Sequence, residues 1–316
     1  MKNNLSNLSE TQSKTFMNVL VDYAFKRIFG SPHNKNIQMS VLNAFLQDYI
    51  GEIKDLELLQ TEQLGILPND KKLSYDVYAK EGEDRRFLIE MQREGQTFYS
   101  RRAIAYVSRA VSNELKRGDR KYIFPDIISL NFLERHHEKI MGGRRFLQRV
   151  MLKNEDNEIF SEKIMFFFVD LSIFASDKAG VDFGDLRQKW AYYIRNIGNL
   201  RESDVRRETG IFREFVDECR MSNLNETEMK EYEKSIMEYA DVQDACVAAK
   251  EDGFAEGKAE GKAEGKAEGK AEGRAEGEAN KAREIALGML AKGYAVNIIS
   301  DLTGLKEDEI RHLQCL

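Results

Sequence analysis

Two segments near the start of the chain, residues 16–29 and 37–50, carry apolar residues every three or four positions. These residues are Leu20, Ala24, Phe25 and Ile28 in the first segment and Val41, Leu42, Phe45 and Leu46 in the second. Such spacing places them on one face of a helix with 3.6 residues per turn. Because Gly30, Ser31 and Pro32 interrupt the pattern, the sequence predicts two helices separated by a turn.

The period of the pattern changes in the next hundred residues. Short apolar stretches at residues 56–64, 73–79 and 87–92 are separated by polar turns and predict three antiparallel strands. Helical spacing returns over residues 97–117, which end before Gly118, and residues 122–132 are again typical of a strand. The order helix, helix, three strands, helix, strand indicates an α/β (α+β) domain.

The remaining residues predict two more strands of this domain, followed by helical regions outside it. Residues 146–152 and 163–174 predict further strands of the same sheet, and residues 184–250 predict helices with many exposed charges. We therefore divide the chain into a first domain at 1–182, a helical extension at 183–250, a glycine-containing repeat at 251–281 and a tail at 282–316.

The repeat places a glycine at every fourth residue from Gly253 to Gly277, mostly in the unit Gly-Lys-Ala-Glu. Each glycine costs a helix about 1 kcal/mol relative to alanine, and the period stacks like charges four residues apart. A stripe of glycine and alanine also lets two helices approach closely, with a right-handed winding because the period exceeds 3.6. The repeat therefore predicts either a flexible or frayed helical tether or a helix that self-associates.

The tail has the pattern of a helix-turn-helix unit. Short helices are predicted at residues 283–291, 296–303 and 306–313, and Gly293 and Gly304 close the first two. The third helix begins with Lys306-Glu-Asp-Glu309, whose carboxylates would repel DNA phosphates. The tail is therefore either a packing or oligomerisation module or a DNA-binding one. The residues expected to point inward are Ile299, Leu305, Ile310 and Leu313.

Charge and cysteine content narrow the choice of partner and compartment. The net charge is -6, but residues 1–150 hold 24 Lys and Arg against 19 Asp and Glu, while residues 151–316 hold 24 against 35. Between Arg93 and Val150, 13 basic residues face 6 acidic ones, which is either a phosphate-neutralising patch or a solvated helix face. The three cysteines are far apart and no apolar run is long enough to span a bilayer. We expect a cytoplasmic protein.

Two carboxylates lie within apolar strand-like segments. Asp76 follows Leu73-Ser-Tyr75, and Glu90 follows Phe87-Leu-Ile89. A hairpin through residues 81–84 would bring them side by side. Because two neighbouring carboxylates are costly to bury without a cation between them, the pair predicts either an exposed strand face or a site for a hard divalent ion such as Mg²⁺.

This arrangement resembles the PD-(D/E)XK nuclease superfamily, which has an Asp on the second core strand and an Ex(K/Q) on the third. Residues 16–175 also carry the motifs Asp22-Tyr-Ala-Phe-Lys-Arg-Ile-Phe-Gly30, Val41-Leu-Asn-Ala-Phe-Leu46, Asp76, Ile89-Glu-Met-Gln92, Phe98, Arg101, Arg102, Tyr106, Gly118, Tyr122 and Pro125. With these motifs, this part of the chain more specifically resembles the Rpn family of recombination-promoting nucleases, also described as transposases. The glycine repeat and Leu302-Thr-Gly-Leu305 of the tail also look like that family. The resemblance implies a restriction-endonuclease-like core, with a mixed central sheet flanked by helices, plus a helical C-terminal extension.

Metal-dependent hydrolysis of DNA is the activity that the resemblance implies. Asp76, Glu90 and the Met91 carbonyl would hold Mg²⁺ or another divalent cation. Gln92 stands where many relatives have lysine. Glutamine hydrogen-bonds but carries no charge, so the positive charge has to come from elsewhere.

Other charged residues are implied to complete the site. Lys26, Arg101 and Arg102 are the candidates for the missing cation, and Asp22 is an additional acidic member. Arg101, Arg102 and Tyr106 are also implied to contact the DNA backbone. Contacts to phosphate position a substrate without identifying its bases, so we expect low sequence specificity.

Two competing hypotheses remain. Without the lysine, the fold could hold DNA or a protein as a catalytically degenerate binding module. Alternatively, the repeat and tail make the chain a structural homo-oligomer. His136 and His137 are adjacent and form no metal-binding motif, and Trp190 is predicted to anchor a helix in the core.

Overall fold

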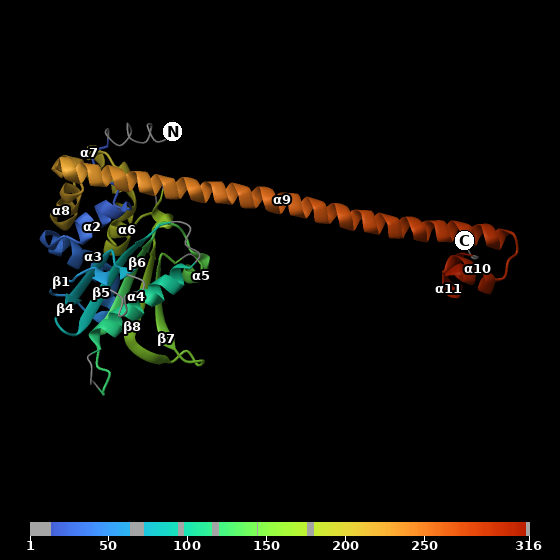
Figure 1. Cartoon of the computed structure of the whole chain (residues 1–316), viewed down its shortest axis with the longest axis horizontal. Coiled ribbons are helices and arrows are strands. Elements are labelled where there is room, and N and C mark those ends of the chain that lie inside the picture. The colour runs from blue at the N-terminus through green and yellow to red at the C-terminus, as the bar shows by residue number, and fades with distance from the viewer. Residues whose placement is uncertain are drawn as a thin grey trace. The chain divides into compact units, whose positions relative to one another are not determined.

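The computed structural model describes residues 14–63, 73–93, 98–115, 120–143, 145–175 and 180–313. It divides into two compact units, Met1–Cys246 and Val247–Leu316. The first unit is built on a six-stranded sheet in the order β1-β4-β5-β6-β8-β7 (Figure 1). Its strands are β1 (Glu57–Leu58), β4 (Val77–Glu81), β5 (Arg85–Gln92), β6 (Asp126–Leu133), β7 (Leu147–Lys153) and β8 (Ile159–Asp170).

The sheet is mixed. β4 and β5 form an antiparallel hairpin, whereas β5, β6 and β8 run parallel, and β7 returns antiparallel to β8. The helix α4 (Tyr99–Glu114) makes the crossover from β5 to β6, because two parallel neighbours cannot be joined by a tight turn. A mixed sheet flanked by helices was the predicted fold class, and it is confirmed.

Helices cover both faces of the sheet. In β5, Ile89 and Met91 face one core together with the helices α2, α3, α6 and α8, whereas Leu88 faces a second core with α4. Trp190 of α6 is fully buried and donates its indole N–H to Ser40 Oγ at 3.1 Å, so it is the predicted core anchor. The helices are α2 (Asp22–Phe29), α3 (Lys35–Ile50), α5 (Glu138–Met141), α6 (Leu186–Asn196), α7 (Glu202–Val205) and α8 (Gly210–Glu218), with 3₁₀ turns at Pro32–Asn34, Leu171–Phe174, Ile197–Asn199 and Met221–Asn223.

The first predicted helix begins later than expected, at Asp22. Residues 15–17 instead pair with the chain that follows α8, and a turn at residues 18–21 leads into α2. Phe16 forms a β-bridge with Arg220, and the Met17 N–H donates to the Cys219 carbonyl at 2.8 Å. The apolar spacing there reflected burial on all sides, not a helical face.

The predicted strands at residues 56–64 and 73–79 are each broken in two. β1 pairs with β4, while β2 (Glu62–Gln63) pairs with β3 (Leu73–Ser74) in a separate small sheet. The break between β3 and β4 falls at Tyr75 and Asp76, where the chain bends. The strand predicted from Tyr122 begins only at Asp126, since Tyr122 has a positive φ of 50°. Gly118, the predicted end of α4, lies outside the described residues.

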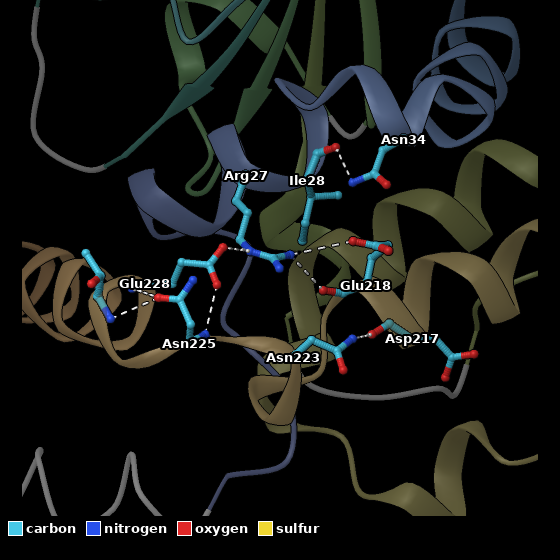
Figure 2. A network of polar contacts seen from close by, with 9 residues as sticks. Arg27, Ile28, Asn34, Asp217, Glu218, Asn223, Asn225 and Glu228 are labelled. Carbon is cyan, nitrogen blue, oxygen red and sulfur yellow. Dashed lines mark hydrogen bonds and ion pairs between the residues drawn. The ribbon is translucent and has the colours of Figure 1, made fainter.

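Figure 2 shows how α2 is fixed against the helices that follow the sheet. Arg27 of α2 donates to the Glu218 carbonyl at the end of α8 and to Glu228 in the first turn of α9 (Glu226–Ala291), both at 3.4 Å. Asn225 caps α9 by accepting the N–H of Glu228 at 3.0 Å. Because α2 also carries Asp22 and Lys26, this network fixes their positions.

The second unit contains the later part of α9 with α10 (Val296–Thr303) and α11 (Glu307–Leu313). The glycine repeat is helical, and a Cβ added at any of its glycines would meet nothing within 4 Å. Gly304 closes α10 with a positive φ of 71°. The predicted inward residues Ile299 and Ile310 are fully buried with Ala286, and Leu305 and Leu313 pack against them.

Candidate active site

Asp76 and Glu90 face each other across the first strand pair of the site. Because β4 pairs with β5 in the register Val77 to Ile89, Asp76, which directly precedes β4, lies opposite Glu90. The Asp76 N–H donates to Glu90 Oε1 at 3.1 Å, and the Met91 N–H donates to Asp76 Oδ2 at 2.9 Å. The hairpin therefore fixes both carboxylates through backbone bonds that do not depend on any ligand.

The pair is short of positive charge. Glu90 is only 4% exposed. Burial, together with the charge of Asp76, holds the pKa of Glu90 well above its ordinary value. Burial also raises the pKa of Asp76, although the Met91 N–H and the Lys26 ammonium oppose the rise. Ionising both carboxylates is therefore costly without a further cation beside them.

The helix α2 brings one such cation to the rim. Lys26 Nζ lies 2.9 Å from Asp22 Oδ2 and 3.7 Å from Asp76 Oδ1. Burial alone would lower the pKa of Lys26, but the Asp22 hydrogen bond and the charges of Asp76 and Glu90 raise it above its ordinary value. Lys26 is therefore a permanently charged member of the site, and Asp22 holds it there.

Gln92 is fixed by both ends of its amide. Its Oε1 accepts a hydrogen bond from Arg102 Nη2, and its Nε2 donates to the Arg93 carbonyl at 2.6 Å. The Arg102 guanidinium also lies 5.0 Å from the Tyr99 ring centre, and its buried Nε has no partner among the described residues. Gln92 consequently holds a second cation, Arg102, beside the carboxylates.

Two predicted residues lie farther out. Arg101 is exposed, and its guanidinium lies 5.1 Å from the centre of the Phe98 ring. Tyr106 is half-buried against Tyr75, with the Arg102 guanidinium 5.7 Å from its ring centre. Burial and then the charge of Glu90 raise the pKa of Tyr106, so its hydroxyl stays neutral.

The donor set suits a hard divalent ion that binds oxygen. Asp76 and Glu90 supply two carboxylates in a site with a deficit of positive charge, which such an ion would remove. Among the described residues, no group of three or more His, Cys, Asp or Glu side chains is arranged to hold a metal. A backbone carbonyl, water and substrate oxygens would have to complete the coordination.

Sequence reasoning missed the polar residues behind the site. The Tyr99 hydroxyl donates to Asn131 Oδ1 at 2.6 Å, and Asn131 pairs with Glu90 across β5 and β6. A signal was available, since Ser129 and Asn131 alternate with apolar residues in β6 and so share a face. Glu134 and Tyr239, which lie beyond the end of β5, had no such signal.

The comparison with protein families decides what this hairpin belongs to. The sequence model of the PD-(D/E)XK nuclease family transposase matches residues 19–249. The chain belongs to this family. A second model, the C-terminal HTH domain of the Rpn/YhgA-like nuclease family, matches residues 279–314, so the predicted Rpn relationship is confirmed. Searches of curated proteins and of solved structures found no match.

Membership of this family makes the chain a nuclease-type protein associated with mobile DNA. The first match contains Asp22, Lys26, Asp76, Glu90 and Gln92. The second covers α10, α11 and the end of α9, where Arg311 of α11 pairs with Glu307 at 2.8 Å. None of the helices that the structure describes is both long enough and apolar enough to cross a membrane.

Proposed function

We propose that this family member is a divalent-metal-dependent DNA endonuclease of low sequence specificity. The observation that carries the proposal is the pair formed by the buried Glu90 and the half-buried Asp76, fixed face to face by backbone hydrogen bonds. Two carboxylates held this close in a poorly solvated site need a cation, and Mg²⁺ is the usual partner of phosphate groups.

The Met91 carbonyl is the third proposed ligand. The Gln92 carbonyl accepts the Glu134 N–H and so points toward β6. Successive carbonyls of a strand point to opposite neighbours, so the Met91 carbonyl points toward Asp76. When bound, a divalent ion supplies charge to a phosphate oxygen and lowers the pKa of a coordinated water.

Lys26 and Arg102 take the role that lysine has in other members of the superfamily. Both lie next to the carboxylate pair, and both are anchored by a hydrogen bond, Lys26 to Asp22 and Arg102 to Gln92. Fixed cations of this kind stabilise charge that develops on a phosphate in the transition state. Asp22 is thus a positioning residue for Lys26.

The exposed side of α4 is the proposed contact for the DNA backbone. Arg101 is exposed one turn along from Phe98, and Tyr106 is half-buried beside Arg102. A guanidinium and a hydroxyl on this side would bond phosphate oxygens. Such contacts position the duplex without identifying bases, which accounts for low specificity.

The test is cleavage of supercoiled plasmid by the full chain with Mg²⁺, with EDTA, and with the isosteric variants Asp76→Asn and Glu90→Gln. We expect nicking that stops in EDTA and falls at least a hundredfold in both variants. Asp126→Asn is the matched control, since Asp126 is a half-buried carboxylate paired with Lys163 at 2.7 Å. Cleavage that persists in both site variants would contradict the assignment.

A second candidate function is a binding module that holds DNA without cutting it. Gln92 favours it, because a neutral amide stands where a lysine would assist the chemistry. Metal-dependent DNA binding by the wild type, without cleavage in Mg²⁺ or Mn²⁺, would place this function first.

Membership of the family also suggests where the protein acts and how it assembles. We place the protein in the cytoplasm, with a role in DNA recombination and with self-association through the C-terminal helical region. The division into residues 1–182, 183–250, 251–281 and 282–316 is part of the same proposal. Light scattering on the full chain and on a chain ending at residue 250 would measure the contribution of the C-terminal region to self-association.

A further inference from the structure

A buried carboxylate lies directly behind the end of β5. Glu134 follows the last residue of β6, and its N–H donates to the Gln92 carbonyl at 2.9 Å. Its side chain is 3% exposed. Because Gln92 is the last residue of β5, this bond fixes the strand end from which the Gln92 side chain reaches Arg102.

The Glu134 carboxylate is held from α6 and α9. Its Oε1 accepts hydrogen bonds from Arg195 Nη1 at 3.2 Å, from the Tyr239 hydroxyl, and from Gln243 Nε2 at 3.4 Å. Its Oε2 has no hydrogen-bond partner among the described residues. An incompletely bonded buried carboxylate is expensive, so each remaining donor matters to where Glu134 lies.

Tyr239 also contacts Arg93, the residue after Gln92. The Arg93 guanidinium lies 5.4 Å from the centre of the Tyr239 ring, and the Arg93 carbonyl accepts the Gln92 Nε2 hydrogen. Tyr239 therefore contacts both residues that bond Gln92 from behind. Its ring and hydroxyl join α9 to the strand that carries Glu90.

A cavity borders the side chains that surround Glu134, so close packing alone does not hold them in place. A cavity of about 470 Å³ is lined by Glu134, Arg195, Tyr239 and Gln243 together with residues of the segment before α2. Side chains beside such a space are placed by their polar bonds more than by close neighbours. The family match ends at residue 249, so this part of α9 belongs to the nuclease module.

We propose that Glu134 and Tyr239 are positioning residues for the nuclease reaction, which hold Gln92, and through it Arg102, in the geometry that the carboxylate site needs. The proposal rests on the nuclease function argued above. It gives the first turns of α9 a direct part in that site, and it predicts that a single hydroxyl group on α9 affects turnover more than it affects substrate binding or stability.

The test compares Tyr239→Phe with the matched control Tyr232→Phe in the full chain. Tyr232 is also buried on α9 and lines the same cavity, but its hydroxyl accepts the Asn18 N–H at 2.8 Å, in the segment before α2. A lost hydrogen bond to a charged acceptor corresponds to about a tenfold change or more. We expect kcat for plasmid nicking to fall about tenfold in Tyr239→Phe, with KM and the Mg²⁺ requirement close to wild type and with a fall in Tm no larger than that of Tyr232→Phe.

The control and a double variant separate positioning from stability. Tyr232→Phe should leave kcat unchanged, and adding Tyr239→Phe to Glu134→Gln should lower kcat no further than Glu134→Gln alone. Equal losses of kcat in the two tyrosine variants, in step with their Tm, would overturn the proposal. So would full activity in Tyr239→Phe.

Amide hydrogen exchange provides an outcome that needs no activity. The Glu134 N–H should exchange faster in Tyr239→Phe than in wild type, and at the wild-type rate in Tyr232→Phe. Unchanged exchange in Tyr239→Phe overturns the positioning role even if the protein proves not to cut DNA. If the wild-type protein does not cut DNA but the Glu134 N–H still exchanges faster in Tyr239→Phe, the link between α9 and β5 is retained while the nuclease function fails.

Discussion

Restoring the superfamily lysine should harm this protein. Gln92→Lys replaces a neutral amide with an ammonium group, although Lys26 and Arg102 already lie beside the carboxylates. The substitution removes the acceptor of Arg102 Nη2 and places a like charge beside that guanidinium. Because lysine has no hydrogen-bond acceptor, the new side chain can donate to the Arg93 carbonyl but cannot accept from Arg102.

The magnitude follows from the charges already present. The site holds three carboxylates (Asp22, Asp76 and Glu90) and two cations (Lys26 and Arg102), a net charge of -1 when all are ionised. A divalent ion brings this to +1, and a further lysine brings it to +2. A single charge roughly 6 Å from a divalent ion repels it by about 1.4 kcal/mol in water and about 5.5 kcal/mol at an effective dielectric constant of 20.

Metal affinity should therefore fall at least tenfold in Gln92→Lys, and plasmid nicking should not exceed the wild-type rate. The assay is Mn²⁺ titration by calorimetry beside nicking at saturating Mg²⁺. Gln92→Leu is the control, since it loses the same hydrogen bonds without adding charge and should keep metal affinity within about threefold. Tighter metal binding and faster nicking in Gln92→Lys would refute the claim that Lys26 and Arg102 already supply the cationic charge.

Three further predictions test separate parts of the structure. The pKa of Glu90 lies above its ordinary 4.5, so the metal-free protein loses stability as the pH rises through the raised value. Glu90→Gln removes this loss and should raise Tm in EDTA by a few degrees at pH 8, with a difference that shrinks toward pH 4.5. Equal Tm values at pH 8 would contradict the claim that burial destabilises the ionised Glu90. Lys26→Met should lower kcat by about a hundredfold, while Lys35→Met, a lysine with the same 41% side-chain exposure, should not; equal effects would count against Lys26. Ile299→Ala should destabilise the second unit by about 2–5 kcal/mol and speed its amide exchange. The thermal unfolding curve followed by the fluorescence of Trp190, the only tryptophan, should not change, because Trp190 lies in the first unit. A shifted curve would contradict the division into two units.

Local patterns predicted the elements that carry the carboxylates. Asp76 and Glu90 interrupt apolar strands, and a hairpin between strands of that length fixes which residues face each other. The sequence therefore predicted that they would meet. It did not predict the bend at Asp76, because the short strands β2 and β3, which form a separate sheet before the bend, have no clear apolar alternation.

Contacts between distant residues account for what sequence reasoning missed. Tyr239 and Glu134 are 105 residues apart, and no spacing rule connects a helix to the end of a strand over such a distance. The roles of Lys26 and Arg102 could only be stated as candidates, since which cation enters the site depends on how α2 and α4 pack on the sheet. The structure brings both to the pair and leaves Arg101 outside.

The central claim is that Asp76 and Glu90 together hold a divalent ion. Calorimetric titration of the metal-free protein with Mn²⁺ at pH 8 tests it most directly, with Asp76→Asn and Glu90→Gln as variants and Asp126→Asn as the control. We predict saturable binding in the wild type and in Asp126→Asn, and its loss in both site variants. Binding that survives in Asp76→Asn and Glu90→Gln, or a wild type that binds no metal, would contradict the account.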